Sequence, residues 1–263
     1  MPPPFRVVTV RRRGAMTPRL VRLTLGGPEL AGLVVDEPAA SVRLLLPAPD
    51  AAGVLEMPVW NGNVFLLSDG RRAPIRTFTP LRLDRDALEL QLEIVIHGAG
   101  LASSWAAGAR PGDQAALSGP ARGYAVDPAV RQWLLAGDET ALPAIGQLLA
   151  AMPATASVEV HVEVAEPAAV APALLGHAPP DARVEWHVRA EGASVGDGFV
   201  GAVVEAAGRL AADTRMWVAG EAAAVQRVRR HLFQERGLPR SQAAVRGYWK
   251  HGRSGDADSA GDT

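Results

Sequence analysis

The amino-acid sequence predicts two domains of different class, an N-terminal antiparallel β domain and a C-terminal α/β domain with a mostly parallel sheet. The chain has 263 residues, of which 48% are hydrophobic, which is enough for two modest domains with their own cores. Up to about residue 126, short β-rich runs alternate with Gly and Pro. From about residue 133, strand-like and helix-like patterns alternate, as in parallel sheets that are covered by helices.

Six short runs of β-forming residues make up the first half. Val21 to Leu25 alternates apolar and polar residues, as expected when one strand face meets a core and the other meets water. Such runs indicate an antiparallel barrel or sandwich. Residues 50–70 contain Gly, Pro and Asn around Trp60 and Phe65, and we expect a long surface connection there. The expected strands are residues 5–10, 20–25, 41–46, 74–79, 88–96 and 114–117.

Strands and helices alternate in the second half, which predicts a mostly parallel sheet covered on both faces. Val225, Val228 and Leu232 form one apolar stripe on the last helix, and Gly237 supplies its stop signal. The small, polar residues 253–263 predict a disordered tail. The expected strands are residues 133–136, 158–164, 184–188, 216–219 and 243–249, and the expected helices are residues 140–151, 199–207 and 221–236.

Composition excludes several classes of function. The chain has 27 basic and 28 acidic side chains, so its formal charge of -1 argues against nucleic acid or an anionic membrane as a partner. It has no cysteine, which excludes disulfides, iron–sulfur clusters and thiolate metal sites, so redox chemistry needs an organic cofactor. No two histidines are spaced i, i+4 on a helix, and we expect no metal site. The start lacks a signal peptide and no window has the ~20 apolar residues of a membrane span, so we expect a cytoplasmic protein without stable membrane insertion.

The stretch Arg76-Thr77-Phe78-Thr79 is the predicted flavin-binding segment. On a strand, Arg76 and Phe78 share one face and Thr77 and Thr79 the other. A guanidinium can hold a phosphate, a flat ring can cover the face of an aromatic cofactor, and a hydroxyl can reach ring heteroatoms. The alternative is an ordinary half-buried strand with a snorkelling arginine.

A strand that runs into a glycine-rich turn and a short helix follows. Glycines allow a close backbone approach, and the helix start offers hydroxyls and free amides to a phosphate. The alternative is a tight turn with a helix N-cap and no ligand. The residues expected to contribute are His97, Gly98, Gly100, Ala102, Ser103 and Ser104.

Two further strands end on glycine followed by an acid. Gly137 precedes Asp138, Glu139 and Thr140, and the second such end is Gly220-Glu221. The three spaced glycines of a dinucleotide fingerprint are absent, and the acids suit ribose or nicotinamide better than phosphate. An acidic N-cap without a ligand is the alternative.

The last strand ends in a group of aromatic and cationic residues. Arg246, Tyr248, Trp249 and Lys250 lie at or near its end, where they can contribute to a ligand site. The alternative is the aromatic edge of a core with solvated charges.

From Phe5 to Gly252 the order of these motifs resembles that of the siderophore-interacting proteins, which are flavin-dependent ferric-siderophore reductases of the ferredoxin-reductase-like superfamily. The run from Gly137 to Ile145 is the most specific part of the resemblance. Phe78 departs from the family, which commonly has Tyr there, and Leu101 stands where we expect Pro.

The resemblance implies an FAD-binding β-barrel over residues 1–126, an NAD(P)H-binding α/β domain over 127–252, and the tail 253–263. It implies hydride transfer from NADPH or NADH to FAD, then single-electron transfer to Fe(III) held by a siderophore, which releases Fe(II). A flavin reductase that serves a protein partner, such as a ferredoxin, and a non-catalytic siderophore-binding module are the alternatives. The choice of siderophore and of NADPH or NADH stays open, as does the oligomeric state, a monomer being one possibility.

The resemblance also assigns roles to residues, with no catalytic group beyond the flavin itself. Arg76 would hold an FAD phosphate, Phe78 would stack near the isoalloxazine, Thr79 would bond the ring edge, and Ser103 would complete the pyrophosphate site. Trp249 would lie close to the flavin. The nicotinamide nucleotide pocket would comprise Asp138, Glu139, Thr140, Gly220 and Glu221. The basic surface for an anionic ferric siderophore would comprise Arg43, Arg122, Arg246 and Lys250.

Overall fold

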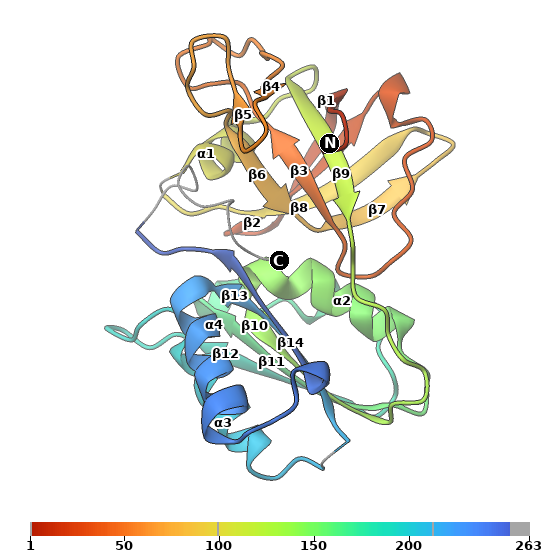
Figure 1. Cartoon of the computed structure of the whole chain (residues 1–263), viewed down its shortest axis with the longest axis vertical. Helices are drawn as coiled ribbons and strands as arrows, with labels where there is room; N and C mark the ends of the chain where they lie inside the picture. Colours follow the sequence, from red (N-terminus) through yellow and green to blue (C-terminus); the bar gives the residue numbers. More distant parts are fainter. Residues whose placement is uncertain (1, 99, 212, 253–263) are drawn as a thin grey trace. The chain divides into compact units, whose positions relative to one another are not determined.

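The computed structural model describes residues 2–98, 100–211 and 213–252 (Figure 1). The described chain divides into two compact units, of which the first ends at Gly123 and the second comprises Tyr124–Gly252. The predicted domain boundary, between residues 126 and 127, lies three residues further along the chain. The predicted tail, residues 253–263, lies outside the described residues.

In the described part of the first unit, seven strands form one sheet whose pairings are all antiparallel, in the order β6-β3-β9-β1-β2-β8-β7. The two edge strands, β6 and β7, are joined by Thr79 alone. A single linking residue holds the two edges of the sheet next to each other, as in a β-barrel. The strands are β1 (Arg6–Thr17), β2 (Leu20–Gly26), β3 (Ser41–Leu45), β6 (Ile75–Phe78), β7 (Pro80–Asp84), β8 (Glu89–Val95) and β9 (Gln114–Ala121).

Short elements complete the first unit. The 3-10 helix η1 (Pro28–Leu30) follows β2, and α1 (Leu101–Gly108) lies between β8 and β9. The stretch 50–70 contains the small hairpin β4 (Val59–Trp60) and β5 (Phe65–Leu66). The predicted surface connection, in which nearly all residues are exposed or half-buried, thus contains a small hairpin, and the ring centroids of Trp60 and Phe65 lie 4.9 Å apart across it.

Strand β2 is covered on both faces, although its alternation predicted one face in water. Leu23 and Leu25 lie in the barrel core, but Thr24 on the opposite face is only 4% exposed. An ion pair between Arg12 of β1 and Glu89 of β8 spans β2, which lies between these two strands. Long charged side chains from the neighbouring strands therefore shield Thr24 from water.

In the described part of the second unit, five strands form a sheet in the order β12-β11-β10-β13-β14. All of its pairings are parallel, which confirms the predicted class of sheet. The strand order reverses at β10, because the chain adds β11 and β12 on one side and then β13 and β14 on the other. The strands are β10 (Gln132–Asp138), β11 (Ser157–Val164), β12 (Ala182–Val188), β13 (Arg215–Glu221) and β14 (Ala243–Trp249).

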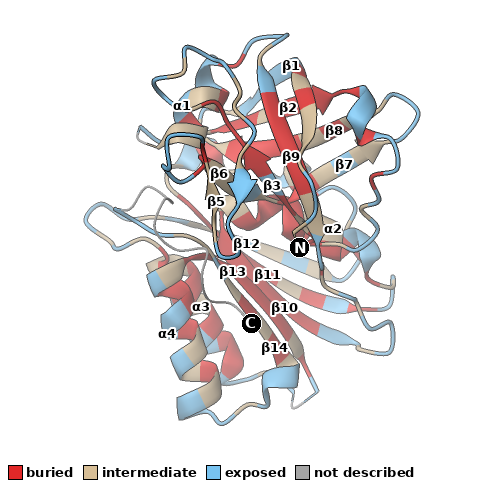
Figure 2. Ribbon diagram, turned by 45° about the horizontal axis from the view of Figure 1, so that its top comes forward, coloured by how far each residue is buried: buried red, intermediate tan, exposed pale blue. Residues whose placement is uncertain are grey.

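Helices cover this sheet. One core cluster joins Leu134 and Val218 of the sheet to Phe199 and Val203 of α3 and to Val225 of α4, and buried residues follow the central strands in Figure 2. The predicted last helix is α4 continued by the π-helical η5. The helices are α2 (Leu142–Ala151), α3 (Asp197–Ala207), α4 (Ala222–Arg229) and η5 (Arg230–Glu235). The 3-10 helices are η2 (Glu139–Ala141), η3 (Pro167–Ala169), η4 (Pro172–Leu175) and η6 (Arg240–Gln242).

Within the described ranges, no helix has both the length and the apolar character needed to cross a membrane.

A buried charge lies on the barrel. Glu93 of β8 is 6% exposed and faces Arg22 of β2 in register, with its Oε1 atom accepting from Nε at 3.0 Å and from Nη2 at 2.5 Å. Burial raises the pKa of Glu93, while Arg22 acts in the opposite direction.

Substitution of Glu93 by Gln will therefore change how stability depends on pH. Because the folded state raises the pKa of Glu93 above its usual 4.5, it binds this proton more readily than the unfolded chain does. The stability that Glu93 contributes is present at low pH and is lost as the pH rises through the folded-state pKa. Urea unfolding of both proteins between about pH 4.5 and 7 will show wild type losing stability relative to Glu93→Gln. A relative gain by wild type would mean that Arg22 outweighs burial.

Candidate functional site

The carboxyl ends of β10 and β13 meet where the strand order reverses. In open α/β sheets, ligands bind beyond the carboxyl ends of the strands at this point. The structure places the five predicted nucleotide-site residues here, at or directly after the ends of β10 and β13: Asp138, Glu139, Thr140, Gly220 and Glu221. Trp249, which was predicted to lie close to the flavin, ends the neighbouring strand β14.

Asp138 joins these strand ends. Its Oδ1 atom accepts from the amide of Thr140 at 2.9 Å and from the Thr140 hydroxyl at 2.5 Å. Its Oδ2 atom accepts from the amide of Glu221 at 2.9 Å and from the Trp249 indole nitrogen at 2.8 Å. Burial raises the pKa of Asp138, and these donors oppose the rise. One buried carboxylate thus connects three parallel strands.

Glu221 organises the adjoining helix start. Its Oε2 atom accepts from the amides of Ala223 at 2.6 Å and Ala224 at 2.9 Å, which caps α4, and its Oε1 atom accepts from the amide of His251 at 3.1 Å. Gly220 precedes it, and a Cβ atom there would lie 2.7 Å from Asp138 Oδ2. Glycine is therefore required for the close approach of β13 to Asp138.

These contacts refine the roles expected for the two acids. The carboxylates of Asp138 and Glu221 face protein donors, so their direct effect is to hold the strand ends in place. Glu139 and Thr140 are half-buried at the turn that follows β10. The contact of Trp249 with Asp138 joins positions 111 residues apart, and no local sequence pattern signals it. Arg246, also half-buried, and exposed Lys250 lie on or just after β14.

The predicted flavin residues lie on the edge strand β6 of the first unit. Arg76 and Phe78 pair with Leu44 and Val42 of β3, two residues of the barrel core, so they share the face directed toward that core. The Arg76 guanidinium donates through Nη1 to the carbonyl oxygen of Ile75 at 2.8 Å. Phe78 is half-buried against the core cluster.

The two threonines differ in exposure. Thr77 is exposed and pairs with exposed Arg43, whereas Thr79 lies beyond the end of β6 and is 8% exposed.

The turn before α1 is held by a serine. Buried Ser103 accepts from the amide of His97 at 2.8 Å and donates to the carbonyl oxygen of His97 at 2.5 Å. Its hydroxyl therefore fixes the turn, and the first amides of α1, which have no acceptor within the helix, are the donors left to a ligand. Gly100 has φ 107°, and a Cβ atom there would lie 3.1 Å from the His97 ring. Burial lowers the pKa of His97, as does the charge of Arg19, so the ring is neutral at neutral pH.

Other predicted residues of this unit surround the turn. Ala102 packs with Leu101 and Trp105 against the same core cluster as Phe78, and Ser104 is exposed. Gly98 lies between His97 and the turn. Exposed Arg122 lines a small hollow of about 160 Å³ with acidic Asp36 and Glu37, whose negative charges reduce the attraction of that place for an anion.

Both halves of the chain match protein families. Residues 9–124 match the family model of the siderophore-interacting FAD-binding domain, and residues 130–252 match that of the siderophore-interacting protein. A siderophore utilization protein from T. fusca, which has a crystal structure, is 35% identical in sequence to this chain. That alignment covers 97% of this chain and 95% of the other, with a TM-score of 0.81.

Two further relatives are named as reductases. Ferric vibriobactin reductase of Vibrio cholerae is 31% identical over 163 residues, which are 60% of this chain and 58% of its own length. NADPH-dependent ferric-chelate reductase of Escherichia coli is 34% identical over 145 residues, which are 55% of this chain and 56% of its own length.

The fold also resembles that of a ferredoxin reductase in carbazole 1,9a-dioxygenase. The identity is 15% and the TM-score 0.67, over 95% of this chain and 70% of the other. This likeness concerns the fold alone, and it confirms the predicted ferredoxin-reductase-like class.

Substitution of Asp138 by Asn tests the tie between the strand ends. An amide group keeps one acceptor oxygen but places an NH2 group against the donors on its other side, so at least one of the four donors is left without an acceptor. We expect the free energy of unfolding to fall by about 1–3 kcal/mol, measured by urea denaturation. Asp181→Asn, at an exposed position of the same unit, is the matched control and should change stability by less than about 0.5 kcal/mol. Equal stability of the two variants would contradict this role.

Proposed function

Because the chain belongs to the siderophore-interacting protein family, we propose that it is a cytoplasmic, NAD(P)H-dependent reductase that contains FAD. It transfers electrons to Fe(III) in a siderophore and releases Fe(II) for iron acquisition. The observation that carries this proposal is the joint presence of an FAD-binding domain of this family and a parallel α/β unit in one chain. The similarity to two relatives named as ferric reductases supports it.

The chemistry needs a carrier that exchanges both pairs of electrons and single electrons. FAD, when bound, would accept a hydride and release its electrons one at a time. It would therefore connect NAD(P)H, a two-electron donor, to Fe(III), which accepts one electron. One NAD(P)H therefore reduces two Fe(III) ions. The chain has no cysteine, and the proposed reaction needs none, because the iron arrives already chelated.

The first unit offers a fitting set of groups for FAD. The guanidinium of Arg76 would hold a phosphate, the ring of Phe78 would lie against the isoalloxazine, and Thr77 and Thr79 would bond polar atoms of the cofactor. The amides at the start of α1 would complete the phosphate site, with Ser103 fixing the turn that presents them.

In the second unit, the nicotinamide nucleotide would bind beyond β10 and β13. Glu139 and Thr140 are the side chains proposed to contact it, and Asp138 and Glu221 hold the strand ends that shape its site.

Cations in both units would attract an anionic ferric siderophore. These are Arg246 and Lys250 in the second unit and Arg43 and Arg122 in the first, of which Arg122 is weakened by neighbouring Asp36 and Glu37.

An anaerobic absorbance assay tests the proposed reaction. Addition of NADPH or NADH to the purified protein will bleach its flavin bands, and a ferric siderophore will restore them while a colorimetric chelator traps two Fe(II) ions per NAD(P)H. Bleaching without reoxidation by ferric siderophores would point to a protein partner as the electron acceptor. Absence of bleaching would contradict the reductase and favour a non-catalytic siderophore-binding module.

Substitution of Arg76 by Ala tests whether this arginine binds FAD. Loss of a charge-assisted hydrogen bond to phosphate costs about 1.5–3 kcal/mol, so the dissociation constant for FAD will rise about 10- to 100-fold, measured by quenching of flavin fluorescence. Arg82→Ala removes an exposed arginine from β7 of the same barrel and should leave FAD binding unchanged. A variant Arg76→Ala that retains its full yellow colour on purification would remove Arg76 from the site.

A further inference from the structure

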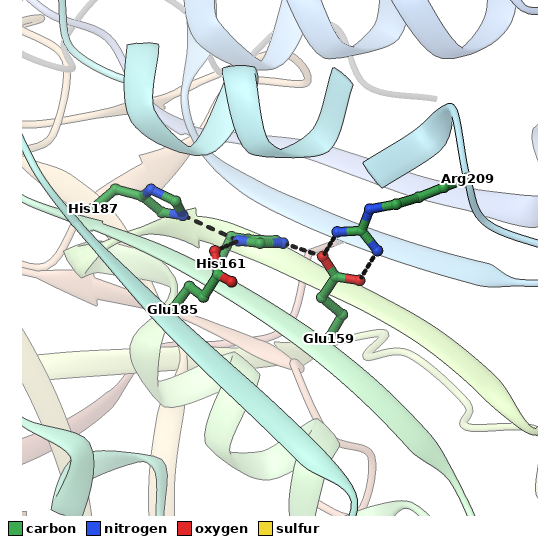
Figure 3. A network of polar contacts seen from close by, with 5 residues as sticks. All are labelled: Glu159, His161, Glu185, His187 and Arg209. Atoms are coloured by element: carbon green, nitrogen blue, oxygen red, sulfur yellow. Dashed lines mark hydrogen bonds and ion pairs between the residues drawn. The ribbon is translucent and has the colours of Figure 1, made fainter. Parts of the chain in front are cut away.

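A cluster of metal-ligand types lies on β11 and β12, outside the residues assigned above. His161 of β11 is 2% exposed, and its Nδ1 atom lies 3.0 Å from Nε2 of His187 and 3.5 Å from Oε2 of Glu185, both on β12. One ligand atom from each of the three residues lies within 4.8 Å of the other two. Figure 3 shows the two imidazoles edge to edge, with Glu185 beside them.

The sheet geometry brings these side chains together. The sequence repeats the pattern Glu-x-His, as Glu159-Val160-His161 on β11 and Glu185-Trp186-His187 on β12. Residues two apart on a strand share a face, and the parallel register pairs His161 with Glu185. Helical i, i+4 spacing of histidines does not signal this cluster, because its residues lie on strands, whose period is two.

A second layer of contacts fixes the orientation of His161. Its Nε2 atom donates to Glu159 Oε1 at 2.7 Å, and Glu159 accepts two hydrogen bonds from Arg209, at 2.9 and 2.5 Å. With its proton on Nε2, His161 presents the lone pair of Nδ1 to the cluster. A carboxylate behind a histidine in this way orients metal-binding imidazoles and raises their basicity.

The distance between Nδ1 of His161 and Nε2 of His187 suits either a hydrogen bond between the two imidazoles or a bound cation. Two nitrogens bound to tetrahedral Zn²⁺ at about 2.0–2.1 Å are roughly 3.3–3.4 Å apart. The present 3.0 Å must therefore widen by only a few tenths of an ångström. His187 is half-buried and the side chain of Glu185 is 67% exposed, so both can adjust and an ion can enter from solvent.

The start of α3 lies near the cluster, since a Cβ atom added to Gly198 would lie 2.8 Å from the Cβ atom of His187. This helix start carries the positive end of a helix dipole, which disfavours a cation. Buried Glu163 offsets it by accepting from the amides of Gly196 and Gly198, both at 2.8 Å.

We propose that His161, Glu185 and His187 form a binding site for a divalent transition-metal cation, best matched by Zn²⁺ with water as its fourth ligand. Two imidazoles and a carboxylate are a donor set that Zn²⁺ uses. When the metal binds, the proton of His187 moves from Nε2 to Nδ1, which frees the Nε2 lone pair for the metal. The ion cross-links β12, the edge strand, to β11. This inference departs from the expectation of no metal site and does not depend on the proposed reductase activity.

Calorimetric titration of ZnCl2 into the whole flavin-loaded protein tests the site, after removal of any affinity tag and of adventitious metal with EDTA. We expect one ion per chain to bind at this cluster. His187→Gln and Glu185→Gln will each raise its dissociation constant at least about tenfold, and Glu159→Gln, behind His161, about 10- to 100-fold. His177→Gln, an exposed histidine of the same unit, is the control and should bind as wild type does.

Circular dichroism will establish that the variants are folded. If His187→Gln does not fold, the zinc affinity of Glu185→Gln tests the site instead, because Glu185 is exposed and its substitution should not disturb the fold. Anomalous diffraction at the zinc edge should place the ion about 2.0–2.2 Å from the three ligands. Absence of zinc binding, equal affinity in wild type and Glu185→Gln, or an anomalous peak elsewhere would overturn the proposal and leave a hydrogen bond between two imidazoles.

Discussion

The second unit depends on one buried carboxylate. Parallel strands carry their polar termini to a common edge, and nothing in the ladder of hydrogen bonds fixes how far each strand extends there. Asp138 fixes this by accepting from residues at the ends of β10, β13 and β14. Removal of a charge from water is tolerated only when donors replace its hydration, so the acid, its donors and Gly220 depend on one another.

In the barrel, the hydroxyl of Ser103 has a role similar to that of the Asp138 carboxylate. Ser103 bonds both the amide and the carbonyl of His97, which fixes the path from β8 to α1. In both units the polar side chain at the strand-to-helix turn bonds its own chain. In the proposed function, recognition of a phosphate or a nucleotide would then be left to backbone amides and to neighbouring side chains such as Glu139. Rigid presentation of amides costs little reorganisation on binding, which is what an anion site at a helix start requires.

Sequence patterns predicted the fold well because periodicity reports directly on burial. Most strands of both units, the parallel sheet and a last helix over residues 221–236 follow from patterns of period 2 and 3.6. The short strands β4 and β5, the edge strand β7 and the change from α4 to η5 were not predicted. Features that depend on distant partners were not predictable in this way. The burial of Thr24 depends on an ion pair between two other strands, and the partner of Trp249 is Asp138. For the site, the sequence identified the turns, but whether Ser103 faces a ligand or its own backbone depends on rotamers that no pattern encodes.

The side chain at position 78 illustrates how packing limits the choice of residue. Phe78 pairs with Val42 on the core-facing side of β6 and packs against the barrel core, so apolar contacts on one side of its ring hold it in place. A tyrosine there would need a partner for its hydroxyl wherever the group left water. Phenylalanine needs none, and its ring face can still cover an aromatic cofactor. At this position the barrel is therefore satisfied by an apolar side chain, and a hydroxyl is not needed by these contacts.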